Sequence, residues 1–117
     1  MEYNDLVKSL LNTFPELMDE YEIQDHIQEL PHCVFSMILV PQIEEWLRNK
    51  EILKLEHLGV LLEQMAISKD VKVREVVNVS VLEPLVLGKD GQTFYFEKFL
   101  GAETLANLHI WRSKYKE

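Results

Sequence analysis

Histidine and cysteine are the residues of this chain that could most readily bind a metal or form a nucleophile with its base. His26, His32, Cys33 and His57 lie in the first half of the 117 residues, and His32 and Cys33 are adjacent. Their spacing matches none of the HxxxH, HExxH or CxxC patterns that zinc sites use. Adjacent residues of a helix also point in different directions, so His32 is badly placed to take a proton from Cys33. We therefore expect no metal, no cofactor and no Cys–His nucleophile.

Carboxylates are the second group of side chains that could do chemistry. Glu16, Asp19 and Glu20 share one face of a helix if their segment is helical, and Glu44 and Glu45 are adjacent. Paired carboxylates can carry out acid–base catalysis or bind a hard cation, but helix surfaces often carry them as solvated charges. No glycine-rich phosphate loop accompanies them. The sequence therefore favours a protein that is not an enzyme, and a small hydrolase or metal site hidden between helices is the alternative.

Acidic charge is concentrated in the first half of the chain. Residues 1–63 contain thirteen Asp and Glu against four Lys and Arg, a net charge of −9, whereas residues 64–117 contain seven against eight. Such charge repels a nucleic acid backbone and speeds the arrival of a basic protein. We predict a surface that binds a protein partner, with the acidic candidates Glu16, Asp19, Glu20, Asp25, Glu44 and Glu45. A solvated acidic face that keeps the protein soluble is the alternative interpretation.

The elements that must position these side chains are predicted to be helices. Apolar residues recur at spacings of three and four, glycine is scarce, and no Ser/Gly-rich linker divides the chain. The predicted helical segments cover about residues 4–12, 15–27, 31–49, 51–67, 71–87, 93–100 and 102 onwards. We predict a single helical domain over residues 1–117, an all-α fold of about six helices in a short HEAT-like right-handed array or an irregular helical bundle.

Some segments also have strand character. Residues 34–40 and 71–79 are rich in apolar and β-branched side chains, and residues 92–96 could form a hairpin after a turn at residues 88–91. We favour helix because Pro31 and Asp70 suit helix starts.

Two residues within the predicted helices have special backbone properties. Pro41 should kink or split its helix, because it has no N–H to donate. Gly59 lies in the middle of a predicted helix, where it costs stability relative to alanine. We therefore expect a neighbouring helix to approach closely at Gly59.

Aromatic residues are dense near the C-terminus: Phe94, Tyr95, Phe96, Phe99, Trp111 and Tyr115. If Tyr95 and Phe96 cannot both lie inside, one of them is exposed and marks a contact surface. We take Tyr95 as the candidate partner-binding residue. A structural or regulatory homodimer that uses these aromatic residues is therefore an alternative function.

Residues 61–87 form a predicted helix, a turn with Asp70, and a second helix that begins Val73-Arg74, and this unit is similar to one HEAT-type repeat. A longer series resembles a family of small, all-helical proteins of unknown function from Bacillus-like bacteria. The matching residues include Leu30-Pro31-His32, Leu62-Glu63-Gln64-Met65-Ala66, Ser68, Asp70, Val73-Arg74-Glu75-Val76 and Phe99-Leu100-Gly101 with Glu103-Thr104. The resemblance covers about residues 6–110 and implies an all-helical fold without an established catalytic residue. The chain departs from it at Pro41, Pro84 and residues 88–91.

Cysteine content and hydropathy bear on where the protein acts. One cysteine excludes an internal disulfide framework and favours the cytoplasm. The first residues are acidic where an export signal would be basic, and the longest apolar run, residues 34–40, is far shorter than the ~20 residues of a membrane span. We therefore predict a cytoplasmic protein-interaction module that avoids membranes and nucleic acid. An immunity protein that masks a toxin, similar in size and acidity, is its most specific form.

Overall fold

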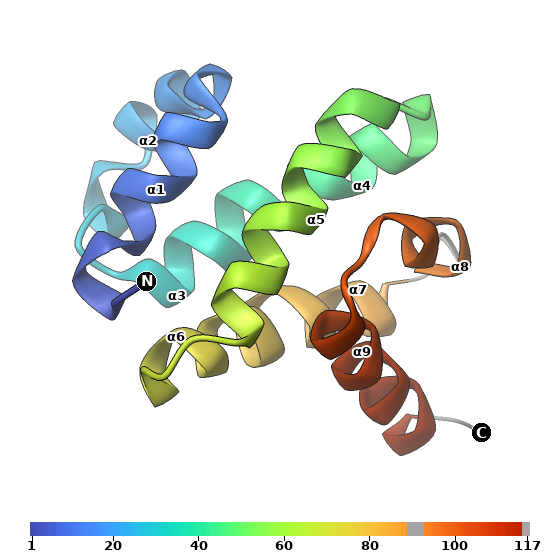
Figure 1. Ribbon diagram of the computed structural model, residues 1–117. Coiled ribbons are helices and arrows are strands. Elements are labelled where there is room, and N and C mark those ends of the chain that lie inside the picture. The colour runs from blue at the N-terminus through green and yellow to red at the C-terminus, as the bar shows by residue number, and fades with distance from the viewer. Residues whose placement is uncertain (89–92, 116–117) are drawn as a thin grey trace.

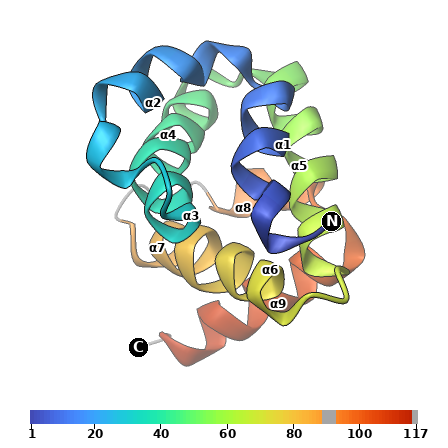
Figure 2. The same cartoon turned by 90° about the vertical axis from the view of Figure 1, so that its left-hand side faces the viewer.

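The computed structural model describes residues 1–88 and 93–115, and this part of the chain is helical without any strand. The prediction of an all-α fold is confirmed. The helices form an irregular bundle in which α5 crosses the face turned to the viewer in Figure 1. In the view turned by 90°, α1 lies between α3 and α5 (Figure 2). None of the described helices has the length and hydrophobicity of a membrane-spanning segment.

The elements follow one another with short connections. The first part of the chain contains η1 (Tyr3–Asp5), α1 (Leu6–Thr13), η2 (Pro15–Leu17), α2 (Met18–Ile23) and η3 (Asp25–Ile27). The middle part contains α3 (Pro31–Val34), η4 (Phe35–Leu39), α4 (Val40–Asn49) and α5 (Ile52–Ala66). The last part contains α6 (Val71–Glu75), η5 (Val76–Leu82), α7 (Glu83–Leu87), α8 (Thr93–Phe96), η6 (Glu97–Phe99) and α9 (Ala102–Lys114).

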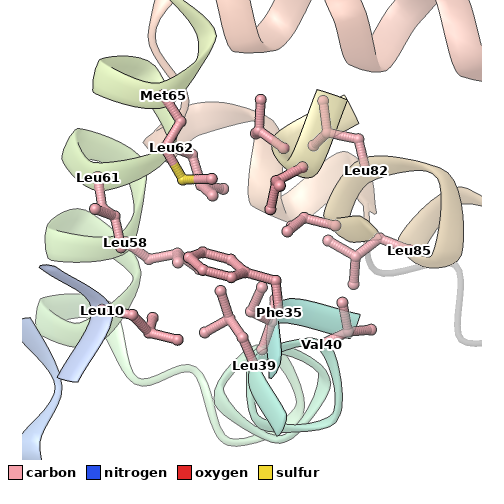
Figure 3. Close-up of a cluster of buried hydrophobic side chains, with 14 of the residues drawn as sticks. Leu10, Phe35, Leu39, Val40, Leu58, Leu61, Leu62, Met65, Leu82 and Leu85 are labelled. Atoms are coloured by element: carbon pink, nitrogen blue, oxygen red, sulfur yellow. The ribbon is translucent and has the colours of Figure 1, made fainter. Parts of the chain in front are cut away.

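A buried apolar cluster holds these elements together, with members from Leu6 in α1 to Leu108 in α9. Figure 3 shows the Phe35 ring between Leu58 of α5 and Leu85 of α7. Phe35, Leu58 and Leu62 are completely buried. Burying each such side chain stabilises the fold by about 1.5–3 kcal/mol before the entropy cost of folding is subtracted. The core therefore fixes α5 against the two long helices at residues 31–49 and 71–87.

Each of these long helices contains a π-helical segment directly before a proline. The segment η4 precedes Val40-Pro41, and η5 precedes Glu83-Pro84. At the ends of these segments the Val40 N–H donates to the Phe35 carbonyl and the Glu83 N–H to the Asn78 carbonyl. Because proline has no N–H, the helix changes its hydrogen-bond register there. The helix at residues 31–49 therefore runs through Pro41 without a break, and the interruption that we expected at Pro41 takes the form of a π segment.

The structure confirms some of the other predicted elements and differs from others. Residues 93–99 are helical and not part of a hairpin, whereas the predicted turn at residues 88–91 falls largely on residues 89–92, outside the described part of the chain. The segment predicted as one helix over residues 15–27 begins as the 3₁₀ turn η2, continues directly into α2, and breaks before η3 because Gln24 has the non-helical angles φ −92° and ψ 58°. The Asp70 cap is confirmed, since its carboxylate accepts from the Lys72 N–H at 3.0 Å.

Candidate functional site

Acidic side chains cover the outside of the segment formed by η2, α2 and η3. Within residues 15–30 the buried side chains are Leu17 and Ile27, which anchor the segment to the core. The short helices between these anchors turn their remaining side chains to the solvent or leave them half-buried. The exposed carboxylates here are Glu16, Asp19, Glu20, Glu22, Asp25 and Glu29.

Large apolar side chains are exposed among these carboxylates. Ile23, at the end of α2, is 73% exposed, and Met18 and Leu30 are exposed as well. Exposed apolar residues rimmed by charge are typical of protein-binding surfaces. We call the exposed residues Met18, Asp19, Glu20, Glu22, Ile23, Asp25, Glu29 and Leu30 the acidic surface.

A groove of about 470 Å³ borders the acidic surface, between α1 and residues 18–31. Val7, Leu11 and Met18 give it apolar lining, and Lys8 and Glu29 add one charge of each sign. The main chain beside it is held by Tyr21 and Gln28: the Tyr21 hydroxyl donates to the Gln28 carbonyl at 3.3 Å, and the Gln28 side chain donates back to the Tyr21 carbonyl at 3.2 Å. The groove can therefore take an apolar side chain beside the acidic surface.

Two of the predicted acidic residues already have partners within the protein. Glu16 forms an ion pair with Lys54 of α5. Partial burial alone would raise the pKa of Glu16, but the hydrogen bond and charge of Lys54 outweigh it and hold this pKa below its ordinary value of 4.5. Glu20 accepts a hydrogen bond from the Gln24 side chain at 2.7 Å. Of the predicted acidic residues in this segment, Asp19 and Asp25 are therefore the better candidates for binding a separate molecule.

Glu44 and Glu45 lie on α4, not on the acidic surface. Glu44 is half-buried and its carboxylate lies beside Gly88 at the end of α7, whereas Glu45 is exposed. Figure 1 shows α2 and the C-terminal end of α4 apart, on either side of α5. The structure thus separates the two groups of carboxylates that the sequence analysis combined.

The aromatic candidate Tyr95 is covered to a large extent. Its ring packs edge-on against Phe99 with 5.5 Å between ring centroids, and the Lys98 ammonium lies 4.1 Å from the Tyr95 ring centroid. Phe96 is fully buried, whereas Phe94 is 70% exposed with the Arg112 guanidinium 4.1 Å from its ring centroid. Phe94, not Tyr95, is therefore the most exposed aromatic residue of α8, because the helix turns residue 96 to the core and residue 94 away from it.

His32 has a polar partner that its sequence neighbours did not indicate. Its Nδ1 lies 2.7 Å from the hydroxyl oxygen of Ser80, which belongs to the π-helical η5. In enzymes with a serine nucleophile, the serine and the histidine that acts as its general base lie at this distance from each other. Ser80 is only 5% exposed, however, so a substrate could not reach its hydroxyl in this conformation. Cys33 packs against the core, and no group of three potential metal ligands occurs in residues 1–88 and 93–115.

Ser68, Asp70 and Arg74, three of the residues that carry the resemblance, join the start of the chain to the turn between α5 and α6. The Ser68 hydroxyl donates to the Met1 carbonyl at 2.6 Å, and Asp70 accepts from the Tyr3 N–H at 2.9 Å. Arg74 donates to the Ser68 carbonyl at 2.6 Å. Ser68, Asp70 and Arg74 therefore have a structural role, which is to hold the first residues of the chain and the turn after α5 in place.

Comparison with known proteins gives a family match without a described function. The family model described as a domain of unknown function, DUF7674, matches residues 7–117. No curated protein and no solved structure matches the chain.

Proposed function

The chain belongs to the family of the domain of unknown function DUF7674, and for this member we propose a role as a protein-interaction module that binds a basic protein partner through the acidic surface. The observation that carries the proposal is the exposed Ile23 among the carboxylates of Asp19, Glu22 and Asp25. The carboxylates attract and orient a basic partner during its approach. Ile23 then supplies an apolar contact that gains free energy when water is excluded from it.

The distribution of charge supports the same proposal. Residues 1–30 contain eight Asp and Glu against a single Lys, so this quarter of the chain has a net charge of −7, close to the −8 of the whole. The negative charge of this segment therefore attracts a partner with a basic surface to one side of the molecule. An immunity-type protein of the bacterial cytoplasm, which covers the basic surface of a toxin, is the most specific form of the proposal.

The experiment compares affinity capture by three forms of the tagged full chain. The test variant carries Asp19→Lys, Glu20→Lys and Asp25→Lys, all on the acidic surface. The control variant carries Glu51→Lys, Glu75→Lys and Glu103→Lys, three exposed residues outside it. Both variants change the net charge by the same amount, so a difference between them reports the location of the charge.

We expect the wild type and the control variant to capture the same basic protein from the native lysate, and the test variant to lose it. If the captured protein is a toxin, co-expression of the wild type should restore growth and co-expression of the test variant should not. Equal capture by the test variant and the wild type would contradict the proposal, as would capture lost equally by both variants.

A further inference from the structure

The groove between α1 and residues 18–31 is continuous with the acidic surface, because Met18 and Glu29 belong to both. Figure 2 views the molecule from the side on which α1 and α2 lie. Val7 and Leu11, one turn apart on α1, are half-buried and give the groove apolar lining. An apolar group that enters the groove therefore lies next to the carboxylates that attract a basic partner.

A row of polar side chains on η1 and α1 also lines the groove. Asn4, Lys8 and Asn12 follow one another at intervals of four residues, which place them on one side of this continuous helical segment. All three are exposed, and neither asparagine carboxamide has a hydrogen-bond partner within residues 1–88 and 93–115. A carboxamide can accept from a backbone N–H and donate to a backbone carbonyl, so it suits the main chain of a bound peptide.

The spacing of the two carboxamides matches an extended chain. Asn4 and Asn12 are eight positions apart, which corresponds to about 12 Å along a helix. Four residues of an extended chain span about 13 Å. An extended segment that lies along α1 can therefore reach both carboxamides with peptide groups four residues apart, and a side chain between these groups can enter the groove.

We propose that this groove binds an extended segment of the basic partner, with one apolar side chain inserted beside Val7, Leu11 and Met18 and the main chain held by Asn4 and Asn12. The inference rests on the proposed function and adds the form in which the partner binds. The apolar side chain gains free energy by leaving water, and the carboxamides fix the direction of the chain.

The charges at the groove orient the segment. Lys8 on α1 repels basic side chains, whereas Glu29 and the other carboxylates of the acidic surface attract them. The basic side chains of the segment therefore point to residues 18–31, and the opposite edge of its main chain faces α1.

The test uses the pentapeptide Lys-Lys-Leu-Lys-Lys, acetylated and amidated so that its terminal charges do not contribute. Its titration into the isotopically labelled full chain, followed by NMR, reports both the affinity and the contact residues. We expect shifts of the side-chain amide signals of Asn4 and Asn12 and of the backbone signals of Val7 and Leu11. The peptide Lys-Lys-Ser-Lys-Lys has the same charge and should bind at least about tenfold more weakly, because it places no apolar group in the groove.

A double variant tests the carboxamides. Asn4→Ala with Asn12→Ala should weaken binding of the leucine peptide about five- to hundredfold, because two hydrogen bonds to its main chain are lost. Asn49→Ala is the matched control at the end of α4 and should bind like the wild type. All three asparagines are exposed, so the variants should keep the fold, which circular dichroism checks.

The charge-reversal variant at Asp19, Glu20 and Asp25 keeps every residue that lines the groove. Its affinity for the leucine peptide should fall mainly at low salt, whereas the loss in the asparagine variant should be similar at low and high salt. Failure of the proposed function would appear as a charge-reversal variant that binds like the wild type. Failure of the present inference would appear as an asparagine variant that does so, and the two outcomes are therefore distinguishable.

Four results would overturn the proposal. These are equal binding of the leucine and serine peptides, unchanged binding by the asparagine variant, NMR shifts confined to residues outside the groove, and the absence of shifts at every peptide concentration.

Discussion

The carboxylate of Glu63, on α5, accepts hydrogen bonds from both the backbone N–H of Thr104 at 3.0 Å and the Thr104 hydroxyl at 2.8 Å. The Glu103 N–H donates to the same carboxylate at 3.2 Å. Glu63 therefore caps the N-terminus of α9 from another helix, where the free N–H groups and the helix dipole favour a negative charge. Gly101 allows this contact, because a Cβ there would lie 2.5 Å from the Glu63 carboxyl.

The first prediction concerns this cap. Glu63→Ala should lower the free energy of unfolding by about 1–3 kcal/mol, because the completely buried Thr104 hydroxyl and the first N–H groups of α9 lose their acceptor. Glu56→Ala, on the exposed side of the same helix, is the control and should change it by less than about 0.5 kcal/mol. Urea unfolding followed by circular dichroism measures both. Equal effects of the two substitutions would contradict the capping role.

The second prediction concerns acid pH. Burial alone would raise the pKa of Glu63, but the hydrogen bonds from Thr104 and Glu103 outweigh it and hold this pKa below its ordinary value of 4.5. A carboxyl group whose pKa is lowered on folding stabilises the protein above its unfolded pKa, and this contribution disappears as the pH falls through the folded pKa. Unfolding free energy should therefore decrease as the pH is lowered from about 5 to about 3.

The matched comparison is again between two positions of α5. Glu63→Gln should be less stable than the wild type at neutral pH and should lose less stability on acidification, because glutamine binds no proton. Glu56→Gln should keep the wild-type dependence on pH. A Glu63→Gln variant with the same dependence as the wild type would show that this carboxylate does not take part.

The third prediction concerns Gly59, which was expected to permit a close approach. A Cβ at Gly59 would overlap the backbone carbonyl of Phe99 in η6, so the approaching element is a 3₁₀ turn and the expectation of close contact is confirmed. Gly59→Ala should destabilise the protein by about 1–3 kcal/mol or more, although alanine is the better helix former. Gly101→Ala should cost about as much as Glu63→Ala, because its Cβ would displace the Glu63 carboxylate from the N-terminus of α9. Thermal unfolding would contradict this reasoning if it placed Gly59→Ala at or above the wild type.

The fourth prediction concerns His32 and Ser80. Ser80→Ala leaves the Nδ1 of His32 without its partner in a half-buried position, so it should lower the unfolding free energy by about 1 kcal/mol. The buried hydroxyl should not react with a fluorophosphonate, a reagent that labels activated serines. Rapid labelling that disappears in both Ser80→Ala and His32→Ala would instead support the hydrolase alternative.

Local periodicity predicted the helices that pack with one continuous apolar face. The segment expected at residues 51–67 is α5, Ile52–Ala66, because Leu55, Leu58 and Leu62 keep the spacing of a buried helix face. Residues 15–27 lacked such a face, since Leu17 and Ile27 are the buried positions there. The break at Gln24 had no signal in the sequence, because glutamine is neither a helix breaker nor a typical cap.

The site was predicted in part. The density of charge in the sequence indicated the acidic segment. It did not reveal that Glu16 forms an ion pair with Lys54 or that Glu44 lies beside Gly88, because these contacts join residues that are far apart in the sequence. His32 and Ser80 are 48 positions apart and Glu63 and Thr104 are 41 apart, distances at which periodicity holds no information.

The most direct test of the central claim is affinity capture by the wild-type chain at two salt concentrations. Attraction between exposed charges is strong at about 0.05 M salt and largely screened at about 1 M. The account predicts one basic protein that is retained at low salt and released at high salt. Retention of the same protein at both concentrations, or capture of a protein without a basic surface, would contradict it.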